Sequence, residues 1–341
     1  MLKIRARHWK PSKFKELGRG GEAVVYKMRK DIVAKVFLLP NAPEFADHAE
    51  LQKAARARIR DMQTKLFEFP RDLPEQLIAP TGVLVDEKDR VFGYVMPFVD
   101  GIPLDKLGRT SSVLTERLTG KLLMSLHNLV SALHARGVVI GDFNENNIIV
   151  TRGKPHLIDA DSMQFGPYQC RSFIPRFTAP ELLKLEKSKV GAKRNGEVVT
   201  PLFSMVAPHS ELTDWYSFLV IAMRLLTFTD PYGGVIKGMD LAERLGKRVT
   251  VFDRRVVYPR VARPIRNVHR PILEVFFRVF CRGERFVPDR ELFEILRTPP
   301  NQTTNRKEEY GKKPDIAIPR TTGPTPRSNP GRTNRRPRSV S

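Results

Sequence analysis

The chain has 341 residues, 41% of them hydrophobic and 28% charged. This length and composition exclude a collagen-like or wholly disordered chain. With 59 basic and 37 acidic residues the formal net charge is +22. That charge favours anionic partners without choosing among nucleotides, nucleic acid, acidic proteins and membrane surfaces. The two cysteines, Cys170 and Cys281, exclude a disulfide framework and a four-cysteine zinc site.

The N-terminal third is predicted to form a β-sheet with one main helix. Short β-prone runs separated by turns occur at residues 14–17, 24–28, 32–37, 82–85 and 91–95. Between the third and fourth of these runs, residues 44–67 are rich in Ala, Arg, Glu, Lys and Gln, which favours a helix. The predicted order is therefore three strands, a helix and two strands.

From Leu107 onward the pattern is mainly helical. Leucines recur at three- and four-residue steps and predict the buried face of one helix: Leu118, Leu122, Leu126, Leu129 and Leu133. Further helices are expected at 214–228, 271–281 and 289–297. The most apolar stretch, Trp215 to Met223, is too short to span a bilayer, and no secretory signal is visible at the N-terminus. We expect a cytoplasmic protein with no membrane partner.

The clearest boundary lies near residue 299. Residues 300–341 contain ten basic and three acidic residues among repeated Pro, Thr, Asn, Ser and Gly. Such a segment cannot bury enough apolar surface to fold alone, so we expect a disordered basic tail. Its charge could support non-specific nucleic-acid contacts.

The first candidate site is a glycine-rich segment between two predicted strands, with Gly18, Gly20 and Gly21. Glycines let backbone N–H groups approach phosphate oxygens, although such a hairpin can also be only a turn. The hairpin context argues against a dinucleotide fold, and no Gly-Lys-Ser/Thr follows to make a P-loop. Lys35, on the next strand with apolar flanks, can neutralise nucleotide phosphates or can be a solvated strand lysine.

The second candidate site lies in a loop-rich stretch. Asp142 precedes Asn147 by five residues, and Asp159 follows a short apolar run. An Asp and an Asn at this spacing can place a base and a metal-binding amide together, and a carboxylate after a strand is suited to Mg²⁺ that bridges phosphates. Each could instead cap a turn.

In this order the motifs resemble the protein kinase fold over most of residues 12–298. The chain looks most like a bacterial protein-kinase-like branch with a Gly-Asp-x-Asn catalytic loop and an Asp-x-Asp metal motif. The resemblance implies an α+β, bilobal fold. An N-lobe of antiparallel sheet and one main helix would span 1–97, a mainly helical C-lobe would span 98–299, and the basic tail would span 300–341.

The resemblance also implies ATP and Mg²⁺ as cofactors. The implied catalytic positions are Asp142, Lys35 and Asn144, and the implied metal ligands are Asn147 and Asp159. The implied nucleotide-binding positions are Gly18, Arg19, Gly20, Gly21, Ala23, Val25, Ala34, Lys35, Glu50, Met96, Phe98 and Val99.

Several of these positions have a specific implied role. Met96 would lie behind the adenine, with Phe98 and Val99 in the hinge. Glu50 would pair with Lys35, although Glu44 and Asp61 remain candidates. In the C-lobe, Asp214 would brace the catalytic loop and Arg285 would pair with Glu181.

The sequence departs from the family pattern at some positions. Ile140-Gly141 replaces the usual His-Arg, whose Arg binds a phosphorylated activation segment, which suggests activity without that phosphorylation. Ala160-Asp161 replaces the usual Phe-Gly, and Asp161 is either a second carboxylate near the metal or a turn cap. A basic insertion at 184–207 could recognise an acidic substrate or be a solvated loop.

The resulting hypothesis is an ATP-dependent protein kinase that acts on a protein hydroxyl, Ser or Thr rather than Tyr, including autophosphorylation. The sequence does not name its protein substrate, and the basic surface would suit an acidic one. The alternative is a pseudokinase-type nucleotide-binding scaffold that binds anionic partners through its basic surface. A small-molecule kinase would lack the Ala-Pro-Glu sequence that ends at Glu181.

Overall fold

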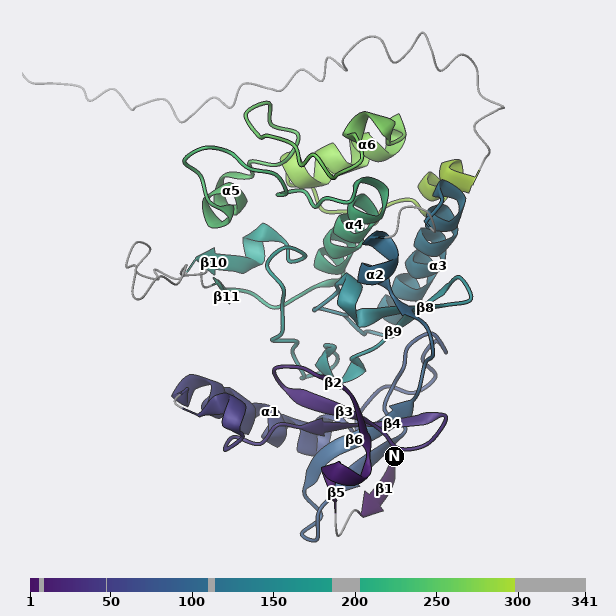
Figure 1. Cartoon of the computed structure of the whole chain (residues 1–341), viewed down its shortest axis with the longest axis vertical. Coiled ribbons are helices and arrows are strands. Elements are labelled where there is room, and N and C mark those ends of the chain that lie inside the picture. The colour runs from purple at the N-terminus through teal and green to yellow at the C-terminus, as the bar shows by residue number, and fades with distance from the viewer. Residues whose placement is uncertain (6–8, 47, 110–113, 186–202, 298–341) are drawn as a thin grey trace, which may run out of the picture. The chain divides into compact units, whose positions relative to one another are not determined.

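A computed structural model describes residues 1–297 except 6–8, 47, 110–113 and 186–202. The described residues belong to one compact unit, Met1–Pro299. The predicted tail at 300–341 and most of the basic insertion lie outside the described residues. The structure is mixed α+β, with an N-terminal sheet followed by a mainly helical part (Figure 1), which confirms the predicted fold class.

The N-terminal sheet has six strands in the order β1-β5-β6-β4-β3-β2. Their bounds are β1 Leu2–Arg5, β2 Lys15–Arg19, β3 Ala23–Lys27, β4 Ile32–Phe37, β5 Gly82–Val85 and β6 Val91–Pro97. All neighbours are antiparallel except β1 and β5, which are parallel. The five predicted strands are present, and β1 is an addition that the sequence reasoning missed.

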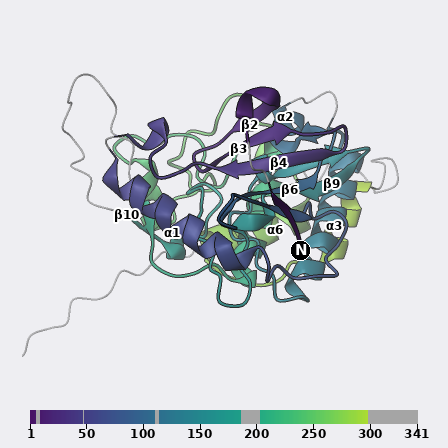
Figure 2. The ribbon, with the colours of Figure 1, turned by 90° about the horizontal axis from the view of Figure 1, so that it is seen from below.

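The main helix, α1, spans Ala49–Lys65 and contacts β6 (Figure 2). It is shorter than predicted because a separate 3₁₀ turn, Pro43–Phe45, precedes it. Met62 and Ala55 on α1 are buried in two apolar clusters that also contain residues of the sheet. Burial of this one face holds the helix against the strands.

The helical part is built around α3 and α4. Its elements are β7 Ile102–Pro103, α2 Leu104–Arg109, α3 Glu116–His134, β8 Ile148–Thr151, β9 Lys154–Leu157, β10 Leu183–Leu185, β11 Phe203–Met205, α4 Glu211–Thr227, α5 Leu241–Lys247 and α6 Arg270–Phe276. The predicted leucine face of α3 is buried, apart from the half-buried Leu118. A π-helical turn, Phe277–Cys281, continues α6, and the last predicted helix is a 3₁₀ helix, Arg290–Arg297. No helix in the described part of the chain is long and apolar enough to cross a membrane.

A short segment before β5 joins the N-terminal region to the β8–β9 hairpin by backbone hydrogen bonds. Ile78 N donates to Leu157 O at 2.8 Å, and Leu157 N donates to Gln76 O at 2.8 Å. Since Leu157 ends β9, the segment from Gln76 to Ile78 holds the hairpin that precedes Asp159.

Candidate functional site

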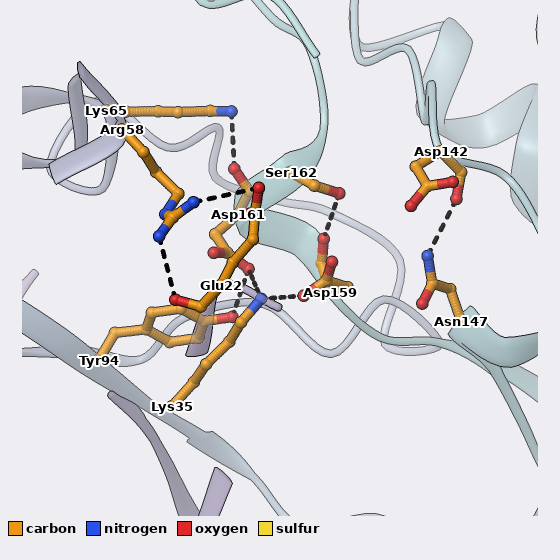
Figure 3. Close-up of polar contacts among 10 residues, drawn as sticks. All are labelled: Glu22, Lys35, Arg58, Lys65, Tyr94, Asp142, Asn147, Asp159, Asp161 and Ser162. Atoms are coloured by element: carbon orange, nitrogen blue, oxygen red, sulfur yellow. Dashed lines mark hydrogen bonds and ion pairs between the residues drawn. The ribbon is translucent and has the colours of Figure 1, made fainter. Parts of the chain in front are cut away.

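Lys35 lies near the end of β4, opposite Val25 of β3 and Tyr94 of β6. Its ammonium forms ion pairs with Asp159 and, at 2.7 Å, with Asp161 (Figure 3). Its side chain is only 12% exposed. The interpretation of Lys35 as a solvated strand lysine is therefore wrong, and its role toward phosphates stays a prediction.

The two carboxylates come from the turn that follows β9. Asp159 has a left-handed φ of 67°, and the Ser162 hydroxyl donates to its carbonyl oxygen at 2.8 Å. Asp161 is the more buried of the two, with a side chain 5% exposed against 29% for Asp159. The turn thus presents one carboxylate that reaches solvent and one enclosed by protein.

Charge and burial act differently on these groups. Burial raises the pKa of the Asp159 carboxyl to about 6, even though Lys35 opposes the shift. Burial alone would also raise the pKa of Asp161, but Lys35 and the Tyr94 hydroxyl lower it below its ordinary value. Burial alone would lower the pKa of Lys35, and the two carboxylates raise it instead. Of the two carboxylates, Asp161 is therefore the one whose charged form its surroundings favour.

The predicted catalytic loop is organised around Asp142. The Asn144 amide donates to Asp142 Oδ1 at 2.9 Å and to the Asp142 carbonyl at 3.0 Å. The Asn147 amide donates to the same carbonyl at 2.9 Å. Burial raises the pKa of Asp142, which suits a carboxylate that accepts a proton.

The β8–β9 hairpin brings the two predicted metal ligands together. Asn147 directly precedes β8, and its carbonyl accepts a hydrogen bond from Ile158 N at 2.9 Å. Asp159 is the next residue along the chain. No group of three or more His, Cys, Asp or Glu side chains that could hold a metal occurs among the described residues. The amide and carboxylate oxygens of Asn147 and Asp159 fit Mg²⁺, which binds one or two carboxylates when phosphates complete its shell.

Two predicted bracing contacts are confirmed. Asp214 of α4 is fully buried and accepts from Ile140 N at 2.7 Å and from Gly141 N at 2.9 Å. The Arg285 guanidinium donates two parallel hydrogen bonds of 2.6 Å to the Glu181 carboxylate. The first contact fixes the backbone just before Asp142, and the second is the bidentate geometry that makes Arg–carboxylate pairs strong.

The predicted pairing of Glu50 with Lys35 is wrong. Glu50 is exposed in the first turn of α1, whereas the end of α1 that reaches the site carries Lys65. Glu44 binds Arg19 at 2.7 Å, and Asp61 lies 3.8 Å from Arg171, so neither alternative acid is the partner. Helix periodicity did not indicate which end of α1 faces Lys35.

The prediction for Ala34 also needs correction. Successive side chains of a strand point to opposite faces, so Ala34 lies on the face opposite to Lys35. It packs with Leu84 and Val95. Val33 lies on the Lys35 face and packs with Ala23, Met96 and the half-buried Val25, Phe98 and Val99. The two-residue period could have identified Val33.

The glycine-rich segment forms a tight hairpin between β2 and β3. Gly18 and Arg19 end β2, Gly21 follows in the turn, and Gly20 N donates to Ala23 O at 2.9 Å. Arg19 is exposed and is bound by Glu16 and Glu44. The Arg58 guanidinium of α1 lies 3.1 Å from the Glu22 carboxylate and so holds the hairpin to the helix (Figure 3). The roles of these residues toward a nucleotide stay predictions.

Two groups at the site were missed by the sequence reasoning. The Tyr94 hydroxyl donates to Asp161 Oδ1 at 2.6 Å, and Lys65 Nζ donates to the Asp161 carbonyl at 2.7 Å. Strand pairing places Tyr94 beside Lys35, but no sequence pattern pointed to Lys65. A cavity of about 630 Å³ adjoins this cluster, lined among others by Glu22, Arg58, Lys65, Asp161, Tyr168 and Ser172.

A family model described as the RIO domain matches residues 44–165. Protein kinase YegI of Escherichia coli strain K12 is 31% identical over 197 residues, which cover 53% of this chain and 28% of the relative. Both matches support a protein-kinase-like superfamily for this chain. The RIO-domain match includes Asp142, Asn147 and Asp159 of this kinase-like chain but begins after Lys35.

A second group of relatives carries a different name. A probable bifunctional tRNA threonylcarbamoyladenosine biosynthesis protein of Methanosarcina acetivorans is 26% identical over 143 residues, 42% of the kinase-like chain and 23% of the relative. The corresponding protein of Methanosarcina mazei is 25% identical over the same length. The kinase-like chain thus spans about a quarter of the length of the curated relatives that it matches.

Proposed function

We propose that the chain is an ATP-dependent protein kinase that transfers a phosphoryl group to a protein hydroxyl, of Ser or Thr rather than Tyr. The observation that carries the proposal is a continuous set of contacts from Lys35 through Asp159 and the β8–β9 hairpin to Asn147 and Asp142. A lysine, two oxygen ligands and a base are the groups that phosphoryl transfer needs.

Each side chain has a definite task in this proposal. Lys35 neutralises nucleotide phosphates, and Asn147 and Asp159 would hold Mg²⁺, which neutralises the charge on the transferred group. Asp142 orients the attacking hydroxyl and accepts its proton, while Asn144 fixes the Asp142 carboxylate through Oδ1. Positioning and charge neutralisation supply most of the rate in such reactions.

The test is incubation of the purified full-length chain with radiolabelled ATP and Mg²⁺, alone and with a generic protein acceptor. We expect label on wild type and its loss, by at least about 100-fold, in Asp142→Asn and Asp159→Asn. Asp89→Asn is the matched control for Asp159→Asn because Asp89 also has a left-handed φ, 57°, and lies in an exposed ion pair with Arg5.

Two outcomes would contradict the proposal. Label that persists in Asp142→Asn would exclude Asp142 as the base. Wild type that binds ATP without transferring phosphate would favour the nucleotide-binding scaffold. Phosphoamino-acid analysis of the labelled product decides between Ser or Thr and Tyr.

A further inference from the structure

Asp161 accepts hydrogen bonds from three different elements of the structure. Its Oδ1 accepts from Lys35 of β4 at 2.7 Å and from the Tyr94 hydroxyl of β6 at 2.6 Å. Its backbone carbonyl accepts from Lys65 at the end of α1 at 2.7 Å. Figure 3 shows Asp161 enclosed by these three side chains. The sheet and the helix together fix the place of this carboxylate.

The helix α1 has no acid in reach of Lys35. Within the described residues, the ion pairs of Lys35 are with Asp159 and Asp161, which come from the same turn. The contacts that α1 makes here come from basic side chains. Lys65 donates to the Asp161 carbonyl in that turn, and Arg58 forms an ion pair with Glu22. A buried ammonium needs an anion, so the turn after β9 must supply it.

The two carboxylates of the turn differ in how readily each can leave its present partners. Asp159 is 29% exposed and adjoins Asn147 through Ile158, whereas Asp161 is 5% exposed and has its Oδ1 occupied by Lys35 and Tyr94. Asp159 also pairs with Lys35, but Lys35 keeps Asp161 as its anion when Asp159 turns toward a cation that arrives with phosphates. Asp161 cannot do so without leaving Lys35 and the Tyr94 hydroxyl.

We propose that Asp161 is the positioning residue of Lys35: it holds the ammonium in place through Oδ1, with Tyr94 and Lys65 holding Asp161, so that Asp159 is free to bind metal. This inference rests on the proposed function. It assigns the turn after β9 two separate tasks, one carboxylate for the metal and one for the lysine.

The test compares Asp161→Asn, Asp159→Asn and Lys35→Met in the full-length chain, by ATP binding and by steady-state phosphoryl transfer over a range of Mg²⁺ concentrations. Asn at position 161 keeps the shape and the oxygen that accepts from Tyr94 but removes the charge. Glu243→Gln, which breaks an exposed pair with Lys247, is the matched control for loss of a carboxylate. Glu50→Gln tests the rival acid on α1.

We expect Asp161→Asn to lower kcat/KM for ATP by about 10–100-fold. We expect the Mg²⁺ concentration at half-maximal rate to stay at the wild-type value in Asp161→Asn and to rise in Asp159→Asn. Combining Asp161→Asn with Lys35→Met should cost little beyond Lys35→Met alone, because both changes remove one interaction. Tyr94→Phe should lose activity in the same direction and to a smaller extent.

Three results would overturn the proposal. The first is a raised Mg²⁺ requirement in Asp161→Asn, which would make Asp161 a metal ligand. The second is a decrease in kcat/KM in the double variant Asp161→Asn with Lys35→Met that equals the combined decreases of the two single variants. The third is a loss in Glu50→Gln as large as that in Asp161→Asn.

Failure of the proposed function has a different signature. If wild type binds ATP without transferring phosphate, the same comparison is made on ATP affinity alone. If wild type binds no ATP, proposed function and positioning role fail together, before any variant is compared. Urea unfolding of the same variants shows whether they fold, and the decrease in unfolding midpoint in the double variant should be smaller than the sum of the single decreases.

Discussion

At the residue scale, the backbone conformation of Gly141 and its neighbour Cys170 together restrict which amino acid can occupy this position. The φ of Gly141 is 76°, and a β-carbon there would lie 2.6 Å from both Cβ and Sγ of Cys170. The protein kinase resemblance places an Arg at this position, where it would bind a phosphorylated activation segment. The backbone and Cys170 leave no room for any side chain here. Activity without that phosphorylation stays a prediction.

Gly141→Ala should destabilise the chain by more than the backbone strain of about 1–3 kcal/mol, because it adds a collision with Cys170. Gly137→Ala is the matched control, since Gly137 has a φ of 68° with nothing within 4 Å of the added carbon. Urea unfolding of both variants measures the difference. Equal decreases in stability would show that Cys170 moves aside without cost.

At the scale of elements, α3 and the pair Glu181–Arg285 stabilise the helical part in different ways. α3 buries a continuous apolar face in the large cluster around it, and Leu133, its last leucine, is fully buried. Glu181–Arg285 instead joins the 3₁₀ turn Pro180–Leu182 to the region after α6 by a charged pair. The first contribution is independent of pH and the second depends on it.

Leu133→Ala should lower the free energy of unfolding by about 2–5 kcal/mol, because it removes buried methyl groups and leaves a cavity. Leu118→Ala, at a half-buried position on the same helix, should cost less. Chemical denaturation of both variants is the measurement. A larger decrease at Leu118 would contradict the packing described for α3.

Glu181→Gln should make stability less dependent on pH in the acid range. Burial would raise the pKa of Glu181, but the Arg285 guanidinium lowers it below its ordinary value of 4.5. A lowered pKa adds stability above the ordinary value, and this stability is lost as pH falls through the folded-state pKa. The difference in unfolding midpoint between wild type and Glu181→Gln should therefore stay nearly constant from neutral pH down to the ordinary value of 4.5 and shrink as the pH falls below it. A difference that grows would reverse the assigned sign.

At the scale of the whole molecule, the order of strands and helices was predictable from the sequence. The β-prone runs that indicate strands and the leucine spacing that indicates a helix each involve residues close together along the chain. The groups around Asp142, Asn147 and Asp159 were also found, since their spacing along the chain is short. The partner of Lys35 was missed because it depends on which end of α1 meets the sheet. Ala34 was chosen over Val33 by its residue type, although strand alternation decides the face.

The net charge of +22 is a property of the whole molecule. Residues 300–341 contribute to it with ten basic and three acidic residues. If this segment contacts nucleic acid, the affinity of the full chain should fall with salt. Deletion of 300–341 should then reduce the log–log salt slope by about 0.7–0.9 for every phosphate that the segment neutralises. Titration of labelled single-stranded RNA at several salt concentrations measures this, and an unchanged slope would remove the segment from any such role.

The backbone bonds from Gln76 and Ile78 to Leu157 have a mechanical consequence. The chain passes from the sheet to the helical part after β6, and these bonds make a second junction away from that crossing. Two junctions restrict movement of the sheet relative to the helical part more than the chain connection alone would. Because Leu157 is bonded through both its N–H and its carbonyl, and Asp159 follows it by two residues, Asp159 cannot move far from the N-terminal region unless both bonds break.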